Sequence, residues 1–341
     1  MIRVGIIGTS FGYKVHLPAF QRDGRCRVTG FAGRDAAKTE KLANEAGVGT
    51  VWPDWKSLVR DSRVDLVSIA VPPIQQREII LECVSRKKPF FCEKPLGFSA
   101  DSGADLVKKA GAVALPAMIN FEFLEVDVWR RAADAVRSGA LGKILSADLS
   151  WMTEIYANRM NLIDSWKVDP SNGGGVIGTH LSHSFYYLEN FFGPCSNLTA
   201  RTLDGERVAH LLMEMESGAL INVSISSKSP AAGGHRMEVS GTEGRLTLSS
   251  VSEDYMKDFS LHIQNRNDKE FMHLASELNA GVAGDGRIPA TASVIRRLID
   301  WIETGFPETP SIAEGVRVDR LIDAARSSAE QGVAVSVSTV S

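Results

Sequence analysis

The first 120 residues alternate between short apolar runs and amphipathic segments, and this alternation restricts the fold more than any other feature of the chain. The apolar runs are rich in β-branched and aromatic residues, which favour strands, whereas the segments between them have helical spacing. Strands that alternate with helices pair in parallel through right-handed crossovers. We therefore predict an N-terminal α/β domain over residues 1–120, built on a doubly wound parallel sheet whose last strand covers residues 112–118.

The first apolar run, residues 2–7, ends in a glycine turn. Gly8, Thr9, Ser10, Phe11 and Gly12 follow it, and helical spacing begins soon after. A strand, a glycine turn and a helix N-terminus form the usual binding site for a dinucleotide pyrophosphate. A full G-x-G-x-x-G motif would need glycine at positions 8, 10 and 13, but this chain has serine at 10 and tyrosine at 13. We predict that the five turn residues bind the cofactor, although the fragment alone is a weak signal.

The second predicted strand, residues 27–32, ends at Gly33-Arg34-Asp35. In such domains a carboxylate at this strand end favours NAD, whereas an arginine accommodates the 2′-phosphate of NADP. The alternative is that Arg34 is a solvated neighbour of Asp35, which would cap the next helix. We predict that Arg34 lies beside the adenosine ribose and that NADP is preferred to NAD.

Two later strands end in prolines, which cannot extend a β-ladder. The run at residues 64–71 ends at Val71-Pro72, and the run at 89–92 ends at Glu93-Lys94-Pro95. Ligands bind beyond the carboxyl ends of parallel strands, so we predict that Val71, Pro72, Glu93 and Lys94 lie at the cofactor. The alternative is that Glu93 and Lys94 are a surface charge pair at a strand end.

The remainder of the chain, residues 121–341, has a different pattern. Helical spacing covers residues 121–138, 290–303 and 313–330, whereas residues 197–249 alternate with a period of two. This pattern predicts an α+β domain with a large open, mainly antiparallel sheet. Helices would cover one face of the sheet and leave the other free for a partner subunit.

A glycine triplet, Gly173-Gly174-Gly175, precedes a predicted helix that carries His180 and His183 on one face. A metal pair would need further ligands at suitable spacing, and we predict no metal site. Two interpretations stay open, namely core histidines that are satisfied by hydrogen bonds and a general base.

Composition excludes several classes of protein. The chain has 341 residues, of which 44% are hydrophobic and 23% charged, with a net charge of −3. A nucleic-acid binder would show a basic face, and no apolar run approaches the ~20 residues of a membrane span. The four cysteines lack zinc or disulfide spacing, and strand-like sequence begins at residue 2. We therefore expect a cytoplasmic protein with reduced thiols that binds neither nucleic acid nor membrane.

The order of these motifs resembles that of the Gfo/Idh/MocA oxidoreductase family over nearly the entire chain. The glycine turn, Gly33-Arg34-Asp35, Val71-Pro72-Pro73 and Cys92-Glu93-Lys94-Pro95-Leu96 all contribute to the resemblance. It implies a Rossmann domain, a second domain over residues 121–341, and a homodimer or homotetramer formed through the open sheet. The family usually has glycine or alanine where Ser10 stands, and often histidine where Gln76 stands.

The resemblance also implies an activity. It predicts hydride transfer between a nicotinamide and a secondary alcohol or ketone of a sugar, cyclitol or nucleotide sugar, with Lys94 and His183 as catalytic residues. His183 follows Gly175 by the eight residues that are typical of the family. Thr179 stands where the family often has aspartate and cannot accept a proton at neutral pH. The residues that we expect to line the substrate pocket are Glu122, Trp166, Lys167, Asp169, Thr179 and His180. Two alternatives are an NAD-dependent glycosidase of the same fold and a cofactor-binding regulatory protein without turnover.

Overall fold

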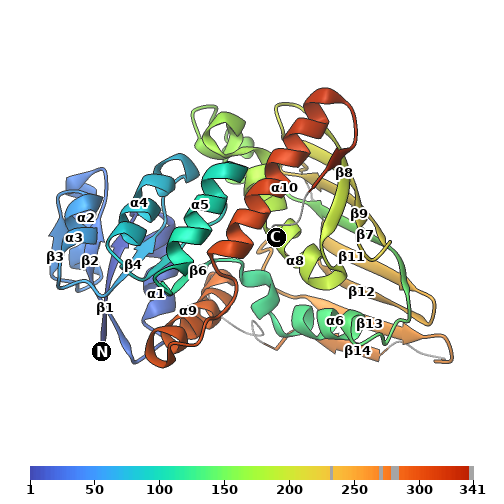
Figure 1. The fold of residues 1–341 in the computed structure, drawn as a ribbon, viewed down its shortest axis with the longest axis horizontal. Helices are drawn as coiled ribbons and strands as arrows, with labels where there is room; N and C mark the ends of the chain where they lie inside the picture. Colours follow the sequence, from blue (N-terminus) through green and yellow to red (C-terminus); the bar gives the residue numbers. More distant parts are fainter. Residues whose placement is uncertain (231–232, 269–271, 278–283, 338–341) are drawn as a thin grey trace. The chain divides into compact units, whose positions relative to one another are not determined.

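The computed structural model describes residues 1–230, 233–268, 272–277 and 284–337 (Figure 1). The chain forms two compact units. The first unit comprises Met1–Glu122 and Arg287–Asp319, and the second comprises Phe123–Gly286 and Arg320–Ser341. The division into domains at residue 120 stays a prediction, and the packing adds a late segment of the chain to the first unit.

The first unit contains a six-stranded parallel sheet with the order β3-β2-β1-β4-β5-β6. This order confirms the predicted doubly wound parallel sheet, since the chain starts at the centre and winds outward in both directions. The strands are β1 (Ile2–Ile7), β2 (Cys26–Ala32), β3 (Thr50–Trp52), β4 (Leu66–Ile69), β5 (Phe90–Cys92) and β6 (Ala117–Ile119).

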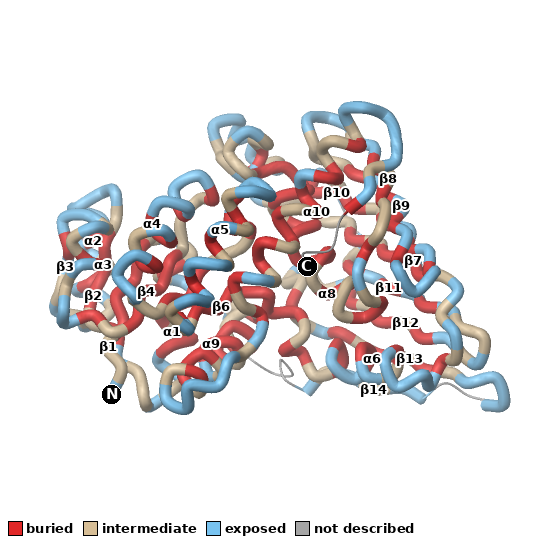
Figure 2. Tube along the Cα trace, in the orientation of Figure 1, coloured by how far each residue is buried: buried red, intermediate tan, exposed pale blue. Residues whose placement is uncertain are grey.

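Helices connect these strands and enclose the core of the first unit, whose strands are mostly buried (Figure 2). A helical segment begins with a π-helical turn, Gly12–His16, and continues as α1 (Leu17–Phe20). The other helices are α2 (Ala36–Glu45), α3 (Trp55–Arg60), α4 (Pro73–Ser85), α5 (Ala100–Gly111), α9 (Arg287–Thr304) and the first part of α10 (Ile312–Gln331). Helix α9 contributes Ile295 and Leu298 to a buried cluster with Val4, Ile6 and Phe20.

The second unit contains a nine-stranded sheet with the order β14-β13-β12-β11-β7-β10-β9-β8-β15. Only the β7–β10 pair is parallel among the described pairs, so the predicted open, mainly antiparallel sheet is confirmed. The strands are β7 (Ile144–Met152), β8 (Cys195–Leu203), β9 (Val208–Met215), β10 (Leu220–Ser226), β11 (Gly234–Gly241), β12 (Gly244–Ser250), β13 (Ser260–Asn265), β14 (Met272–Ala275) and β15 (Val335–Ser336).

Helices cover one face of this sheet. Helix α6 (Asp127–Arg137) packs against β12 and β13 (Figure 1), and α8 (Ser182–Phe192) packs against α6. Every second residue of β9 is buried, from Ala209 to Met215, and the residues between them are exposed. The short helix α7 (Tyr156–Arg159) precedes the loop that leads to the glycine triplet.

Two predicted elements were wrong in extent. The strand predicted for residues 112–118 is confined to β6, because α5 runs to Gly111 and is followed by a turn with Ala114 at a φ of 45°. The helix predicted for residues 121–138 is interrupted at Val126, whose ψ of 126° is extended. A short 3₁₀ turn, Glu122–Glu125, lies before this break, and α6 lies after it.

Membrane-spanning helices were also sought. Among the described residues, no helix combines the length and the apolar character that crossing a bilayer requires.

Candidate active site

The glycine turn lies at the carboxyl end of β1. Gly8 has a φ of +113°, and a Cβ at this position would lie 2.2 Å from the carbonyl oxygen of Ala70. Only glycine therefore allows the turn to pass this close to the end of β4. The helical segment that starts at Gly12 has no acidic residue in its first turn, so its N-terminal N–H groups face no competing carboxylate. Thr9, Ser10 and Phe11 are intermediate or exposed, which fits a phosphate-binding turn.

The end of β2 lies against this turn. A Cβ on Gly33 would lie 2.6 Å from the Thr9 side chain, so the two segments touch. Arg34 is exposed directly beyond this contact, at the position predicted to read the adenosine ribose. The Asp35 carboxylate accepts a 3.0 Å hydrogen bond from the Lys38 N–H and caps α2, as its place in the sequence predicts. Arg34 is therefore the charged residue at this strand end that stays available to a ligand.

Glu93, at the end of β5, is held by a hydrogen-bond network. Its Oε1 lies 2.9 Å from Nε2 of His16 and accepts a 2.8 Å hydrogen bond from Nδ2 of Asn120. The other ring nitrogen of His16 lies 2.8 Å from Oγ of Ser68 on β4. Burial raises the pKa of Glu93, but the hydrogen bond and charge of His16, with Lys94 and Asn120, lower it below its usual value. Glu93 is therefore a fixed carboxylate and not a surface charge.

Gln76 on α4 supports the backbone around Lys94. Its Nε2 donates to the carbonyl oxygens of Glu93 and Pro95, the second at 3.0 Å, so the amide spans the residues on both sides of Lys94. Pro72 is the N-cap of α4, and its carbonyl accepts the Gln76 N–H at 3.1 Å. Val71 and Pro72 are partly exposed. The structure thus brings Val71, Pro72, Glu93 and Lys94 together at the carboxyl ends of β4 and β5, where a ligand of a parallel sheet binds.

Two aromatic contacts surround Phe11. Its ring lies edge-on to His16, with 5.4 Å between the ring centres, and the guanidinium of Arg287 lies 4.9 Å from its ring centre. The sequence did not predict His16, Asn120 or Arg287, because their partners are distant in the chain. Glu122, predicted to contact the substrate, is buried at the end of the same unit.

The other predicted substrate residues lie in the second unit, where a tight loop precedes α8. A Cβ on Gly174 would lie 1.9 Å from the carbonyl oxygen of Trp166, so the glycine triplet allows two backbone segments to meet. The Asp169 carboxylate accepts hydrogen bonds from Ser171 and Asn172 and caps its own turn. Trp166 is partly exposed and Lys167 is exposed. The triplet and Asp169 therefore shape this loop.

Thr179 fixes the orientation of His180. The Thr179 hydroxyl donates to the carbonyl of Gly175 at 2.6 Å and lies 2.8 Å from Nδ1 of His180. Since a hydroxyl has one hydrogen, Nδ1 of His180 is the donor in the second bond. His180 and His183 are both buried, and both rings contact Trp151, at centre distances of 4.7 and 6.4 Å. The predicted common face of the two histidines is confirmed.

An ion pair between Arg326 and Glu206 supports the glycine loop. Nε and Nη2 of Arg326 on α10 donate to the two carboxylate oxygens of Glu206 at 3.0 and 3.1 Å, and Nη2 also donates to the Gly174 carbonyl at 2.9 Å. The Glu206 carbonyl accepts the Val176 N–H at 2.6 Å. This pair could not be predicted from the sequence, because Glu206 and Arg326 lie 120 positions apart in the chain.

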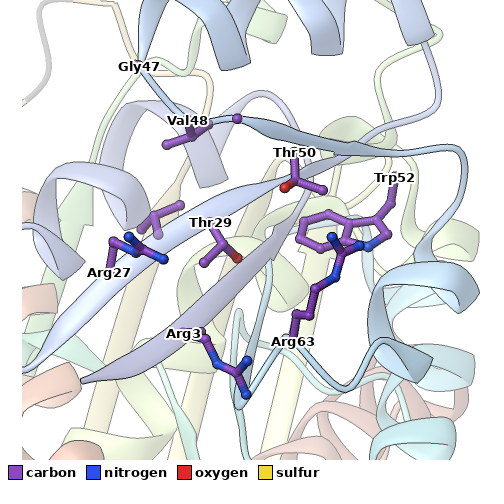
Figure 3. A pocket seen from close by; sticks show the side chains of 10 residues that line it. Arg3, Arg27, Thr29, Gly47, Val48, Thr50, Trp52 and Arg63 are labelled. Carbon is purple, nitrogen blue, oxygen red and sulfur yellow. The ribbon is translucent and has the colours of Figure 1, made fainter.

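A cavity of about 390 Å³ in the first unit lies away from all the predicted site residues (Figure 3). Its side chains include Arg3 and Arg27 near the beginnings of β1 and β2, Trp52 at the end of β3 and Arg63 between α3 and β4. Two of its guanidinium groups are already paired, since Arg3 and Arg63 each lie 2.6 Å from an aspartate oxygen. No predicted site residue lines the cavity, so it takes no part in the arrangement above.

Comparison with known proteins gives an independent view of the chain. Residues 2–121 match the model of the Gfo/Idh/MocA oxidoreductase family with its NAD-binding Rossmann fold, and residues 133–337 match the C-terminal alpha/beta domain of that family. An uncharacterized oxidoreductase of Synechocystis sp. is 26% identical, with 94% of this chain and 92% of that protein covered. A D-xylose 1-dehydrogenase (NADP(+)) of Haloferax volcanii is 29% identical, with 97% and 98% covered.

Solved structures share the fold. A levoglucosan dehydrogenase in complex with NADH and L-sorbose has a TM-score of 0.89 at 20% identity, with 99% of each chain covered. An oxidoreductase domain protein from Kribbella flavida has a TM-score of 0.85 at 19% identity, also with 99% of each chain covered.

Proposed function

Because the chain belongs to the Gfo/Idh/MocA family of NAD-binding oxidoreductases, we propose that it oxidises or reduces a secondary alcohol or ketone of a sugar, cyclitol or nucleotide sugar. The Haloferax volcanii relative, which is named for D-xylose, supports this substrate class. When bound, the nicotinamide cofactor supplies or accepts the hydride, and the protein supplies orientation and acid–base groups.

The position of Lys94 carries the proposal. Lys94 follows β5 at the carboxyl ends of the parallel strands, and the glycine turn follows β1 at the same end of the sheet. Glu93 and Pro95 on either side of it are fixed by buried hydrogen bonds. In this role the Lys94 ammonium donates to the reacting oxygen of the substrate and stabilises the negative charge that develops on it.

We assign proton transfer at the hydroxyl to His183, since imidazole titrates near neutral pH. Thr179 and His180 contact the substrate in this proposal. Glu122, Trp166, Lys167 and Asp169 complete the assignment as pocket residues.

For the cofactor, we propose that Gly8, Thr9, Ser10, Phe11 and Gly12 bind the pyrophosphate and that Arg34 contacts the 2′-phosphate of NADP. The exposed position of Arg34 beside the turn supports the preference for NADP, as does the cofactor in the name of the Haloferax volcanii relative. Val71, Pro72 and Glu93 lie at the neighbouring strand ends and would border the nicotinamide ribose.

The decisive experiment is Lys94→Ala, assayed over a panel of sugars and cyclitols with both cofactors. We expect cofactor affinity to be retained and kcat to fall by about 10²–10⁴-fold. Lys108→Ala, an exposed lysine on α5, is the matched control and should leave kcat unchanged. A Lys94→Ala variant with the wild-type kcat would remove Lys94 from the mechanism. Cofactor binding without any turnover in the wild type would favour the regulatory alternative.

The same assay tests Arg34. Arg34→Ser should weaken NADP binding by about 10–100-fold, as expected for loss of a hydrogen-bonded charge pair, and leave NAD binding unchanged. Equal losses for both cofactors would mean that Arg34 does not contact the 2′-phosphate.

We also propose that the exposed face of the nine-stranded sheet forms the interface of a homodimer or homotetramer. Leu212 and Leu220 lie on that face among polar residues. Light scattering of the purified protein measures the molar mass directly, and a monomer at micromolar concentration would contradict this part of the proposal.

A further inference from the structure

Glu93 and Glu122 follow the adjacent parallel strands β5 and β6, Glu93 directly and Glu122 at the start of the 3₁₀ turn. Cys92 of β5 pairs with Ile119 of β6, and the Asn120 N–H donates to the Cys92 carbonyl at 2.9 Å. Asn120 then donates its side-chain amide to Glu93. The segment that leads to Glu122 therefore runs beside the segment that contains Glu93 and Lys94, within one unit.

The two carboxyl groups have opposite surroundings. Glu93 accepts hydrogen bonds from His16 and Asn120, which stabilise its charged form. Glu122 is only 1% exposed, so its charged form would have little contact with water. Two carboxylates that share one region cannot both ionise freely, and the more completely buried of the two keeps its proton more readily. The Glu93 side chain is 15% exposed, so Glu122 is the more buried group.

The electrostatics agree with this geometry. Burial and then the negative charge of Glu93 raise the pKa of Glu122 to about 8, although Lys94 and Arg287 act in the opposite direction. The charged groups that act on Glu122 include Glu93 and Lys94 after β5 and Arg287 at the start of α9. His16 contacts Glu93 and so acts on Glu122 indirectly. Burial therefore favours the protonated form of Glu122 beside the charged form of Glu93.

We infer that Glu122 is a positioning residue whose proton keeps a second negative charge away from Lys94, so that the ammonium retains its full effect on the reacting oxygen. This inference rests on the proposed role of Lys94. When Glu122 ionises, Lys94 faces two carboxylates, and its stabilisation of a developing alkoxide weakens. Turnover should therefore decline on the alkaline side in either reaction direction, without any change in the proton balance of the reaction itself.

Glu122→Gln tests the inference, because glutamine reproduces the neutral carboxyl group and cannot ionise. The wild type should lose about tenfold in kcat as the pH rises through about 8, whereas the kcat of Glu122→Gln, relative to its own value at neutral pH, should show no such decline. Glu82→Gln is the matched control, since its carboxyl lies on α4 beside Arg60 and Arg86 and has a lowered pKa. An unchanged alkaline decline in Glu122→Gln would overturn the inference.

A second measurement needs neither turnover nor cofactor. In protein labelled with ¹³C at the glutamate carboxyl carbons, the resonance absent from Glu122→Gln should titrate near pH 8 in the wild type. In Glu93→Gln it should titrate at lower pH, because the nearby negative charge is gone. Titration of this resonance in the ordinary range, near 4.5, would overturn the inference. If the titration is near 8 but no sugar or cyclitol is turned over, the proposed function fails and the assignment of Glu122 as the protonated carboxyl survives.

Discussion

His16 offers the sharpest test of how the end of β5 is held. The side chain is fully buried, and its two ring nitrogens join Ser68 on β4 to Glu93 after β5. Its ring also packs against Phe91 and Phe11, at centre distances of 5.0 and 5.4 Å. His16→Phe keeps a ring of similar size in these contacts and removes both hydrogen bonds, so it isolates their contribution.

The magnitude follows from the two bonds. An ordinary buried hydrogen bond contributes about 1 kcal/mol and one to a charged group about 1.5–3 kcal/mol, so His16→Phe should lower the free energy of unfolding by about 2.5–4 kcal/mol. For a unit of this size, Tm should fall by about 5–15 °C. Denaturant unfolding followed by circular dichroism measures the first quantity, and calorimetry measures the second. Tyr13→Phe, which removes a hydroxyl 3.4 Å from the exposed Glu45 carboxylate, is the control and should change stability by less than about 0.5 kcal/mol.

The effect of His16→Phe on the free energy of unfolding should depend on pH. The folded-state pKa of Glu93 lies below its ordinary value of 4.5, although burial opposes this, because His16 favours the charged form. Such a group stabilises the protein above its unfolded-state pKa and loses that contribution as the pH falls through the folded-state pKa. The difference between wild type and His16→Phe should therefore be complete at neutral pH and shrink in acid below about 4.5. A His16→Phe variant within 0.5 kcal/mol of wild type at neutral pH would refute the reasoning.

Two further variants test the glycine turn and the loop support. Gly8→Ala should weaken NADP binding at least about tenfold in calorimetry, because the added Cβ would clash with the Ala70 carbonyl oxygen. The control is Gly47→Ala, since Gly47 also has a positive φ but an added Cβ there would meet nothing within 4 Å. This control should lower stability by only about 1 kcal/mol and leave NADP binding unchanged. Arg326→Met should lower the free energy of unfolding by about 2–3 kcal/mol in urea, because Glu206 and the Gly174 carbonyl lose their donors, whereas Lys228→Met at the exposed pair with Asp204 should change it by less than about 1 kcal/mol. If Gly8→Ala and Gly47→Ala weakened NADP binding equally, the explanation of the glycine turn would be wrong. If Arg326→Met and Lys228→Met lowered stability equally, the explanation of the loop support would be wrong.

Helices and strands could be predicted from local sequence where a residue type or a pattern favours one kind of structure. Pro73 in the first turn of α4 (Pro73–Ser85) and the polar residues after Ser85 are signals of this kind, because proline favours the first helical position. The alternation of apolar and polar residues predicted β9 and β10 for the same reason, since a period of two fits one buried face.

Longer-range features could not be predicted in this way. The lone His16 in an apolar helix resembles an ordinary core residue, and its partner Glu93 lies 77 positions later. The break at Val126 was also hidden, because residues on both sides of it have helical spacing. It separates two packing environments, since Glu122 belongs to the first unit and the Phe123 ring packs in the second unit against Trp129 and Tyr187.

Helix α9 makes the first unit depend on residues that are synthesised late. Ile295 and Leu298 complete the core around Val4 and Ile6, yet about 160 residues of the second unit are translated between them and β6. When the ribosome has just passed residue 122, the N-terminal sheet is already synthesised, but the α9 residues that complete its core are not. The second unit also includes Arg320–Ser341, so both units are completed only near the end of synthesis. The N-terminal strands wait longest for the residues that complete their core, and they are therefore the part of the nascent chain that is exposed to aggregation for the longest time.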